Sequence, residues 1–229
     1  MLPVKSLSLV DQVADRVRHH IAANGLQPGD ALPSAAELGQ ILDVSRGVVR
    51  EAMQLLEASG IIEVSNGRRP VVRRLEPVML AATFDHGLAT RQFSVGDVGA
   101  FRRTIECETA ALAAARRSDA EAARLLDLAG EMEASIDDPH RFTDFDLAFH
   151  ATLAEACGNP VFALTGRALT LSIREMIQGG LAAIRERAEW DRVVATHRGI
   201  AEAVHGGEAD NARRLMRLHF DDAITRLRV

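Results

Sequence analysis

The sequence has no run of apolar residues that approaches the roughly 20 needed for an α-helix to cross a bilayer. Its first residues also lack the basic segment and apolar core that mark a signal peptide. We therefore expect a cytoplasmic protein with no membrane partner. Only two cysteines are present, Cys107 and Cys157, and neither belongs to a CxxC pair. They predict neither a disulfide framework nor a zinc knuckle.

The chain also has no excess of positive charge, because its 27 basic residues are outnumbered by 32 acidic ones and the formal net charge is −5; Lys5 is the only lysine. Residues 1–75 contain nine basic and eight acidic residues, whereas residues 76–229 contain 18 basic and 24 acidic ones. DNA binding requires a local basic face rather than a basic protein. In the N-terminal part, the arginines at positions 46, 50, 68, 69, 73 and 74 are clustered enough to form such a face.

The pattern of residues 1–75 predicts three helices followed by a β-hairpin. Apolar residues recur at helical spacing over residues 9–23, Ser34 and Glu37 form a capping box, and Ser45 can cap a third helix. Two β-prone runs, Ile61–Val64 and Pro70–Val72, follow with a turn between them. Helices joined by a very short turn and followed by a hairpin are typical of a winged helix-turn-helix. The alternative is another small α+β domain that ends in a hairpin.

Residues 94–229 predict an all-helical domain. About six helices with short connections indicate an antiparallel bundle, and Ser118 and Glu121 form a second capping box. Asn159-Pro160 caps another helix, and the pairs Gly179-Gly180 and Gly206-Gly207 are expected to mark breaks between the last helices. Residues 76–93 are either a linker or an additional helix. The expected fold is therefore mostly α, with domains at residues 1–75 and 94–229.

Two sets of motifs resemble known bacterial families. The segments Leu32–Leu38, Val44–Ala52 and Leu56–Gly60 resemble the winged helix of the GntR family of transcription regulators. The C-terminal half resembles the ligand-binding FCD domain of the FadR-type subfamily. That second resemblance rests on residues that fall in the expected order: Arg102, Ile105, Glu106, Asp146, His150, Gly158, Asn159, His197, Gly207, Ala212 and His219.

The third helix would be the recognition helix, whose N-terminal side chains enter the major groove. Arg46 and Arg50 lie four residues apart and point the same way, and an arginine can grip guanine with two parallel hydrogen bonds. Arg68 and Arg69 in the wing would meet the DNA backbone or minor groove. The positions expected at the DNA are Ser34, Ser45, Arg46, Gly47, Val48, Arg50, Gly67, Arg68 and Arg69.

The chain departs from the usual GntR pattern at three places. Ala36 replaces an arginine that tends to contact DNA in the family, and Gly47 replaces a frequent threonine. The wing reads Gly67-Arg68-Arg69-Pro70, where the family usually has a glycine-rich turn with Gly-Thr. These changes leave DNA binding expected but put the usual family operator in doubt. One domain offers too little contact for tight binding, so a homodimer on a palindromic operator is expected.

Asp146 and His150 are four residues apart in a predicted helix and therefore share a face. The resemblance adds His197 and His219 from the last two predicted helices as further metal ligands. Three imidazoles and one carboxylate suit a divalent transition metal rather than calcium. Zinc is the first choice, with nickel, manganese or iron as alternatives, and coordination positions remain free for a ligand oxygen.

The resemblance also implies a small carboxylate effector, such as a sugar acid or hydroxy acid, that coordinates the metal directly. Arg102 would be a second clamp for the carboxylate, and its alternative role is an internal salt bridge to Glu106. Further pocket candidates are Asn159, Ser172 and Arg174.

The expected function is a metabolite-responsive, DNA-binding repressor. The alternative is a metal-dependent enzyme, because an open metal site can activate water. No HExxH or similar metal-plus-base motif is present to support catalysis. A regulator of the fatty-acyl-CoA type is disfavoured, because that branch generally lacks the metal-binding histidines.

Overall fold

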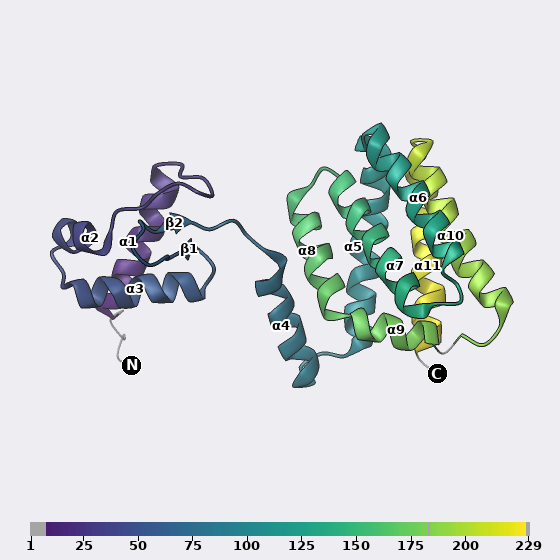
Figure 1. Cartoon of the computed structure of the whole chain (residues 1–229), viewed down its shortest axis with the longest axis horizontal. Coiled ribbons are helices and arrows are strands. Elements are labelled where there is room, and N and C mark those ends of the chain that lie inside the picture. The colour runs from purple at the N-terminus through teal and green to yellow at the C-terminus, as the bar shows by residue number, and fades with distance from the viewer. Residues whose placement is uncertain (1–7, 183, 228–229) are drawn as a thin grey trace, which may run out of the picture. The chain divides into compact units, whose positions relative to one another are not determined.

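The computed structural model describes residues 8–182 and 184–227, and the chain divides into two compact units, one ending at Leu75 and the other beginning at Glu76 (Figure 1). The first unit contains α1 (Leu9–Ala23), α2 (Ala35–Leu42), α3 (Arg46–Ala58), β1 (Ile62–Glu63) and β2 (Val71–Val72). The described part of the second unit contains α4 (Pro77–Ala89), α5 (Val95–Arg116), α6 (Asp119–Ala134), α7 (Pro139–Ala156), α8 (Pro160–Ser172), α9 (Arg174–Ala182), α10 (Arg187–His205) and α11 (Ala209–Leu227).

The first unit has its own apolar core. Val13 and Val17 of α1 face Val49 and Leu56 of α3, and all four side chains are at most 3% exposed. The helix starts follow the sequence signals: the predicted capping box of Ser34 and Glu37 begins α2, and Ser45 caps α3. These features confirm the predicted three-helix arrangement.

The turn between α2 and α3 is tight and depends on the backbone conformation of Asp43 and on the small size of Gly39. Asp43 caps α2 in the left-handed conformation at φ 52°, and the amide of Val44 donates to the carbonyl of Gly39 at 3.0 Å. A Cβ atom at Gly39 would lie 3.0 Å from the carbonyl oxygen of Val44. Glycine therefore permits the close approach that closes this helix-turn-helix.

The predicted hairpin is present but shorter than expected. Strands β1 and β2 have two residues each and pair antiparallel, with Ile62 opposite Val72 and Glu63 opposite Val71. Ala31 forms an isolated bridge to Val71, so the segment before α2 extends the pairing. Ile62 and Val72 are buried in the core, which is why this register is held although the ladder is so short.

In the second unit, α5 lies at the centre of a helical bundle and packs against α7, α8, α10 and α11 (Figure 1). The bundle core includes Phe142, Phe149, Leu128 and Met132, none of which is measurably exposed. The predicted all-helical architecture is confirmed, including the capping box at Ser118 that begins α6.

Residues 76–93, for which the sequence left two possibilities, contain the helix α4. It packs against α8, and its Phe84 and Leu88 contact the buried residues Val98 and Leu169. No described helix is long and apolar enough to cross a membrane.

The pair Gly179-Gly180 does not end a helix, contrary to the prediction. The break comes earlier, at Ile173, and α9 continues through both glycines. A glycine inside a helix costs about 1 kcal/mol relative to alanine. The neighbouring Leu181 is 7% exposed and packs into the bundle core, and this packing offsets the poor helix propensity.

Candidate functional site

The exposed start of α3 carries the residues predicted to read DNA. The side chain of Ser45 accepts a hydrogen bond from the amide of Val48 at 3.3 Å and so fixes the first turn. Arg46, Gly47 and Arg50 are exposed, and Val48 is partly buried against the core. The helix therefore presents two arginines on one accessible face, held by a capped and well-packed helix.

The wing presents its two arginines differently. Gly67 has φ 73°, a left-handed conformation that suits glycine in this turn. The Arg68 side chain is exposed and makes no ion pair or hydrogen bond with the described residues. Arg69 donates to Glu37 Oε1 at 2.6 Å, while the other oxygen of Glu37 accepts from the amide of Ser34 at 2.7 Å. Arg69 thus connects the wing to the capping box of α2, a contact that the sequence did not reveal.

Three histidines converge inside the second unit. His150 of α7, His197 of α10 and His219 of α11 each place a ring nitrogen within 4.8 Å of the others. The ring centroids of His197 and His219 are 4.6 Å apart, and those of His150 and His219 are 5.1 Å apart. Phe149, which is fully buried, packs edge-on against the His197 ring and orients α7 toward the cluster.

Asp146 lies beside two of these rings. Its Oδ1 atom is 3.0 Å from His197 Nε2 and 3.8 Å from His150 Nε2. The carbonyl of Val193 lies 2.8 Å from His197 Nδ1, and since a carbonyl only accepts, Nδ1 carries the proton. In the neutral ring Nε2 then has only a lone pair, and this buried atom has no hydrogen-bond partner. An imidazole lone pair and a carboxylate oxygen so close together suit a shared cation.

The protonation states also fit metal ligands. Burial raises the pKa of Asp146, but His197, His150 and His219 outweigh it, and the net pKa lies below its ordinary value. Burial, together with the neighbouring His197 and His150, lowers the pKa of His219 well below its ordinary value. An ionised carboxylate and a neutral imidazole are the forms that bind a metal.

A second buried carboxylate lies on the far side of His150. Glu106 Oε2 is 2.5 Å from His150 Nδ1, and Glu106 Oε1 accepts from Arg102 Nε at 2.6 Å. Burial raises the pKa of Glu106, but Arg102 and His150 lower it more, so the net pKa is lowered. The salt bridge that the sequence left as the alternative role of Arg102 is therefore present. Arg102 Nη2 nevertheless stays buried without a hydrogen-bond partner, and the guanidinium lies 5.1 Å from the ring centroid of Phe220.

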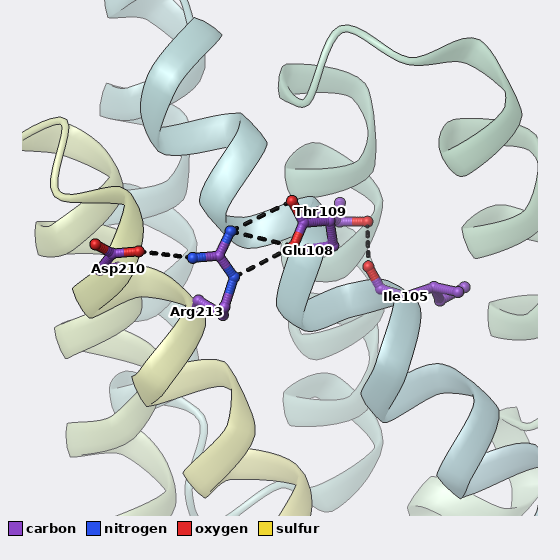
Figure 2. Close-up of polar contacts among 5 residues, drawn as sticks. All are labelled: Ile105, Glu108, Thr109, Asp210 and Arg213. Carbon is purple, nitrogen blue, oxygen red and sulfur yellow. Dashed lines mark hydrogen bonds and ion pairs between the residues drawn. The ribbon is translucent and has the colours of Figure 1, made fainter.

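Ion pairs between α5 and α11 flank His219. Figure 2 shows Arg213 of α11 between Glu108 of α5 and Asp210, with Arg213 Nη2 at 3.1 Å from Glu108 Oε2. Two turns farther along α11, Arg103 of α5 donates to both carboxylate oxygens of Asp221. Exposed pairs of this kind contribute little, and the buried residues Ala212, Met216 and Phe220 hold α11, with the histidine that it carries, against the bundle core.

Three effector candidates make contacts of other kinds. The Asn159 side chain caps α8 by accepting from the amide of Val161 at 3.0 Å. Ser172 donates to the carbonyl of Ala81 in α4 at 3.1 Å. Arg174 pairs with Asp144 at 2.5 Å, and both side chains are about half exposed. Of the four effector candidates, Arg102 alone is linked to the histidine cluster by contacts among the described residues, through Glu106.

The remaining histidines lie on the surface. The exposed set comprises His19, His20, His86, His140 and His205.

Comparisons with known families match both units. Residues 9–72 match the bacterial regulatory proteins of the GntR family, and residues 97–222 match the FCD domain. This chain belongs to the GntR family of transcription regulators, in the FadR-type group with an FCD domain. It is a DNA-binding regulator rather than an enzyme, so the alternative of a metal-dependent enzyme is set aside.

Individual relatives agree with this assignment. The regulator LutR of Bacillus subtilis is 28% identical over 197 residues, which cover 85% of this chain and 90% of LutR. A putative L-lactate dehydrogenase operon regulatory protein of Escherichia coli is 28% identical over 221 residues, covering 93% of this chain and 83% of the relative. The solved structure of a Streptococcus agalactiae GntR protein superposes with a TM-score of 0.71 at 26% identity, covering 94% of this chain and 99% of that one.

Proposed function

We propose that this regulator is a cytoplasmic repressor whose operator affinity changes when a small carboxylate binds beside a metal ion in the FCD domain. Asp146, His150, His197 and His219 would hold the ion, and zinc is the first choice for this donor set, with nickel or manganese as alternatives. The observation that carries the proposal is the meeting of three histidine nitrogens within 4.8 Å, beside a buried carboxylate.

Unpaired buried atoms support a ligand at this place. His197 Nε2 and Arg102 Nη2 are both buried without hydrogen-bond partners. A buried polar atom left unpaired costs roughly 1–3 kcal/mol, and more when the group is charged. A cation shared with Asp146 would satisfy the histidine, and an anionic ligand would satisfy the guanidinium. A metal ion with an acid bound to it would therefore provide partners for both atoms.

When bound, a divalent ion supplies an open coordination position for a carboxylate oxygen. Arg102 would contribute the remaining contact, because a guanidinium donates two parallel hydrogen bonds to a carboxylate. The cation–π contact with Phe220 and the salt bridge with Glu106 hold Arg102 in place for this role. We propose a hydroxy acid or sugar acid as the effector class, and the E. coli relative, a putative L-lactate dehydrogenase operon regulatory protein, agrees with a hydroxy acid.

At the other unit, two copies of the winged helix in a homodimer would bind a palindromic operator. Arg46 and Arg50 would read base edges, Ser34, Ser45, Gly47 and Val48 would lie close to the DNA, and the wing at Gly67, Arg68 and Arg69 would add backbone contacts. Effector binding would favour one arrangement of the dimer and thereby change the spacing of its recognition helices. We propose that effector binding lowers the affinity of the protein for its operator, so that the protein leaves the DNA.

The test measures operator affinity by fluorescence anisotropy, on a duplex that the wild-type protein selects from a random library. Zinc-loaded protein is titrated with L-lactate and with gluconate, and chelator-treated protein is the reference. We expect at least one acid to weaken DNA binding only when zinc is present. His197→Ala should abolish this response, whereas His205→Ala, an exposed histidine on the same helix, should retain it. An unchanged response in the His197 variant would refute the proposed site.

A further inference from the structure

Glu106 is buried between two groups of the proposed sensing site and uses one carboxylate oxygen for each. Its Oε1 atom accepts from Arg102 Nε at 2.6 Å, and its Oε2 atom lies 2.5 Å from His150 Nδ1. The Glu106 side chain is 9% exposed and that of His150 is 3% exposed. Surface salt bridges contribute little, but a buried carboxylate between two partners fixes the geometry of both.

We infer that Glu106 is a positioning residue that selects the Nδ1–H tautomer of His150 and so leaves His150 Nε2 free to bind the metal. This inference rests on the proposed metal site. The contact between Glu106 Oε2 and His150 Nδ1 does not have the full geometry of a hydrogen bond, but the two atoms are only 2.5 Å apart. A carboxylate oxygen only accepts, and two lone pairs this close would repel each other, so we assign the proton to Nδ1. The opposite ring nitrogen, Nε2, faces Asp146 at 3.8 Å.

Arg102 gives Glu106 its orientation. Because Arg102 Nε occupies Oε1, the carboxylate turns its second oxygen toward the histidine. His197 reaches the same result by another route, since its Nδ1 faces the carbonyl of Val193 on its own helix. Among the described residues, His150 Nδ1 has no backbone acceptor of this kind, and the carboxylate of Glu106 is the acceptor instead. Acceptors behind metal-bound histidines typically change metal affinity by 10–100-fold when removed.

Glu106→Gln is the sharpest variant, because the amide has nearly the same shape but only one acceptor oxygen. If the amide nitrogen faces His150, it requires an unprotonated Nδ1, which moves the proton to Nε2 and blocks that atom as a ligand. If the oxygen faces His150, the amide nitrogen meets the donor Nε of Arg102, and this repulsion displaces the side chain. Both arrangements disturb the metal ligand.

Glu108→Gln is the matched control. Glu108 lies two residues farther along α5, is exposed, and pairs with Arg213 of α11 (Figure 2) rather than with a histidine of the cluster. The same chemical change is therefore made on the same helix without touching His150. Circular dichroism of each metal-free variant shows whether the helical content is retained.

Two measurements test the inference on the full-length chain. Competition titration of Zn²⁺ against a chromophoric chelator should show about 10–100-fold weaker binding for Glu106→Gln, and wild-type binding for Glu108→Gln. Long-range ¹H–¹⁵N spectra of metal-free wild-type protein, assigned with a His150→Gln variant, should show His150 as the Nδ1–H tautomer. The spectra need no Glu106 variant, so they decide the matter even if Glu106→Gln does not fold.

The outcomes separate the inference from the proposed function. If wild-type protein binds no Zn²⁺, the proposed metal site is wrong and the inference fails with it. If wild-type protein binds Zn²⁺ and Glu106→Gln binds it equally well, only the inference fails. An Nε2–H tautomer of His150 in the metal-free wild-type protein would overturn it as well.

Discussion

Replacing Arg68 with alanine gives a quantitative test of the wing as a DNA contact. The exposed Arg68 side chain makes no polar contact with the described residues, so its charge is available to a phosphate. The neighbouring Arg69 already donates to Glu37 at 2.6 Å. Two adjacent arginines on one wing therefore differ in what they can offer to DNA, although the sequence makes them look equivalent.

The expected size follows from counterion release. Each phosphate that a protein neutralises changes the slope of log affinity against log salt concentration by about 0.9. Two wings of a homodimer give about 1.8, so a fourfold rise in salt should weaken wild-type binding by about 12-fold more than it weakens the Arg68→Ala variant. Fluorescence anisotropy with the selected duplex, between about 50 and 200 mM salt, measures this difference.

Arg69→Ala should reduce the slope less than Arg68→Ala, because Glu37 already neutralises part of the Arg69 charge. Glu37→Gln removes that carboxylate and should make the wild-type slope steeper. Equal slopes for the two arginine variants would show that Arg69 leaves Glu37 and contacts a phosphate as readily as Arg68 does. A wild-type slope in both variants would show that the wing does not meet phosphates, and the reasoning would fail.

Two further predictions concern stability. Gly39→Ala should destabilise the first unit by up to about 2 kcal/mol, because overpacking against the Val44 carbonyl (about 1–3 kcal/mol) exceeds the gain of about 1 kcal/mol in helix propensity. Gly47→Ala, whose Cβ would meet only Ser45 Oγ at 3.7 Å, should instead be stabilising, and urea unfolding that gave both variants the same sign would contradict this. The hydrogen bonds from Ser118 lower the pKa of Glu121 from 4.5, so Glu121 stabilises the native state above that pH and loses its effect as the pH falls through the lowered value. The melting-temperature gap between wild type and Glu121→Gln should therefore shrink between about pH 5 and pH 3, and a constant gap would refute this.

The helix boundaries were predictable because they depend on local hydrogen bonds. Ser34, Ser45, Ser118 and Asn159 all cap helices in the structure, and the sequence predicted a helix start at each of them. Local signals did not predict whether residues 76–93 form a helix, nor that α9 continues through Gly179-Gly180. Both depend on burial of apolar residues such as Phe84 and Leu181 against distant helices, which no local signal encodes.

The candidate site was predictable only in part. Asp146 and His150 share a helical face by spacing alone, but the approach of His197 and His219 requires the packing of α10 and α11, and only the family resemblance anticipated it. Glu106 was noted as a partner of Arg102, yet its contact with His150 joins residues 44 positions apart on different helices. Effector candidates such as Arg174 were named without a geometric criterion, and this one pairs with Asp144 on an exposed face.

The metal content of protein purified without chelators tests the central claim most directly. Inductively coupled plasma mass spectrometry should find close to one equivalent of zinc, nickel or manganese per chain, and the double variant His197→Ala/His219→Ala should contain none. Wild-type protein that carries no transition metal, and takes up none when Zn²⁺ is added, would contradict the account.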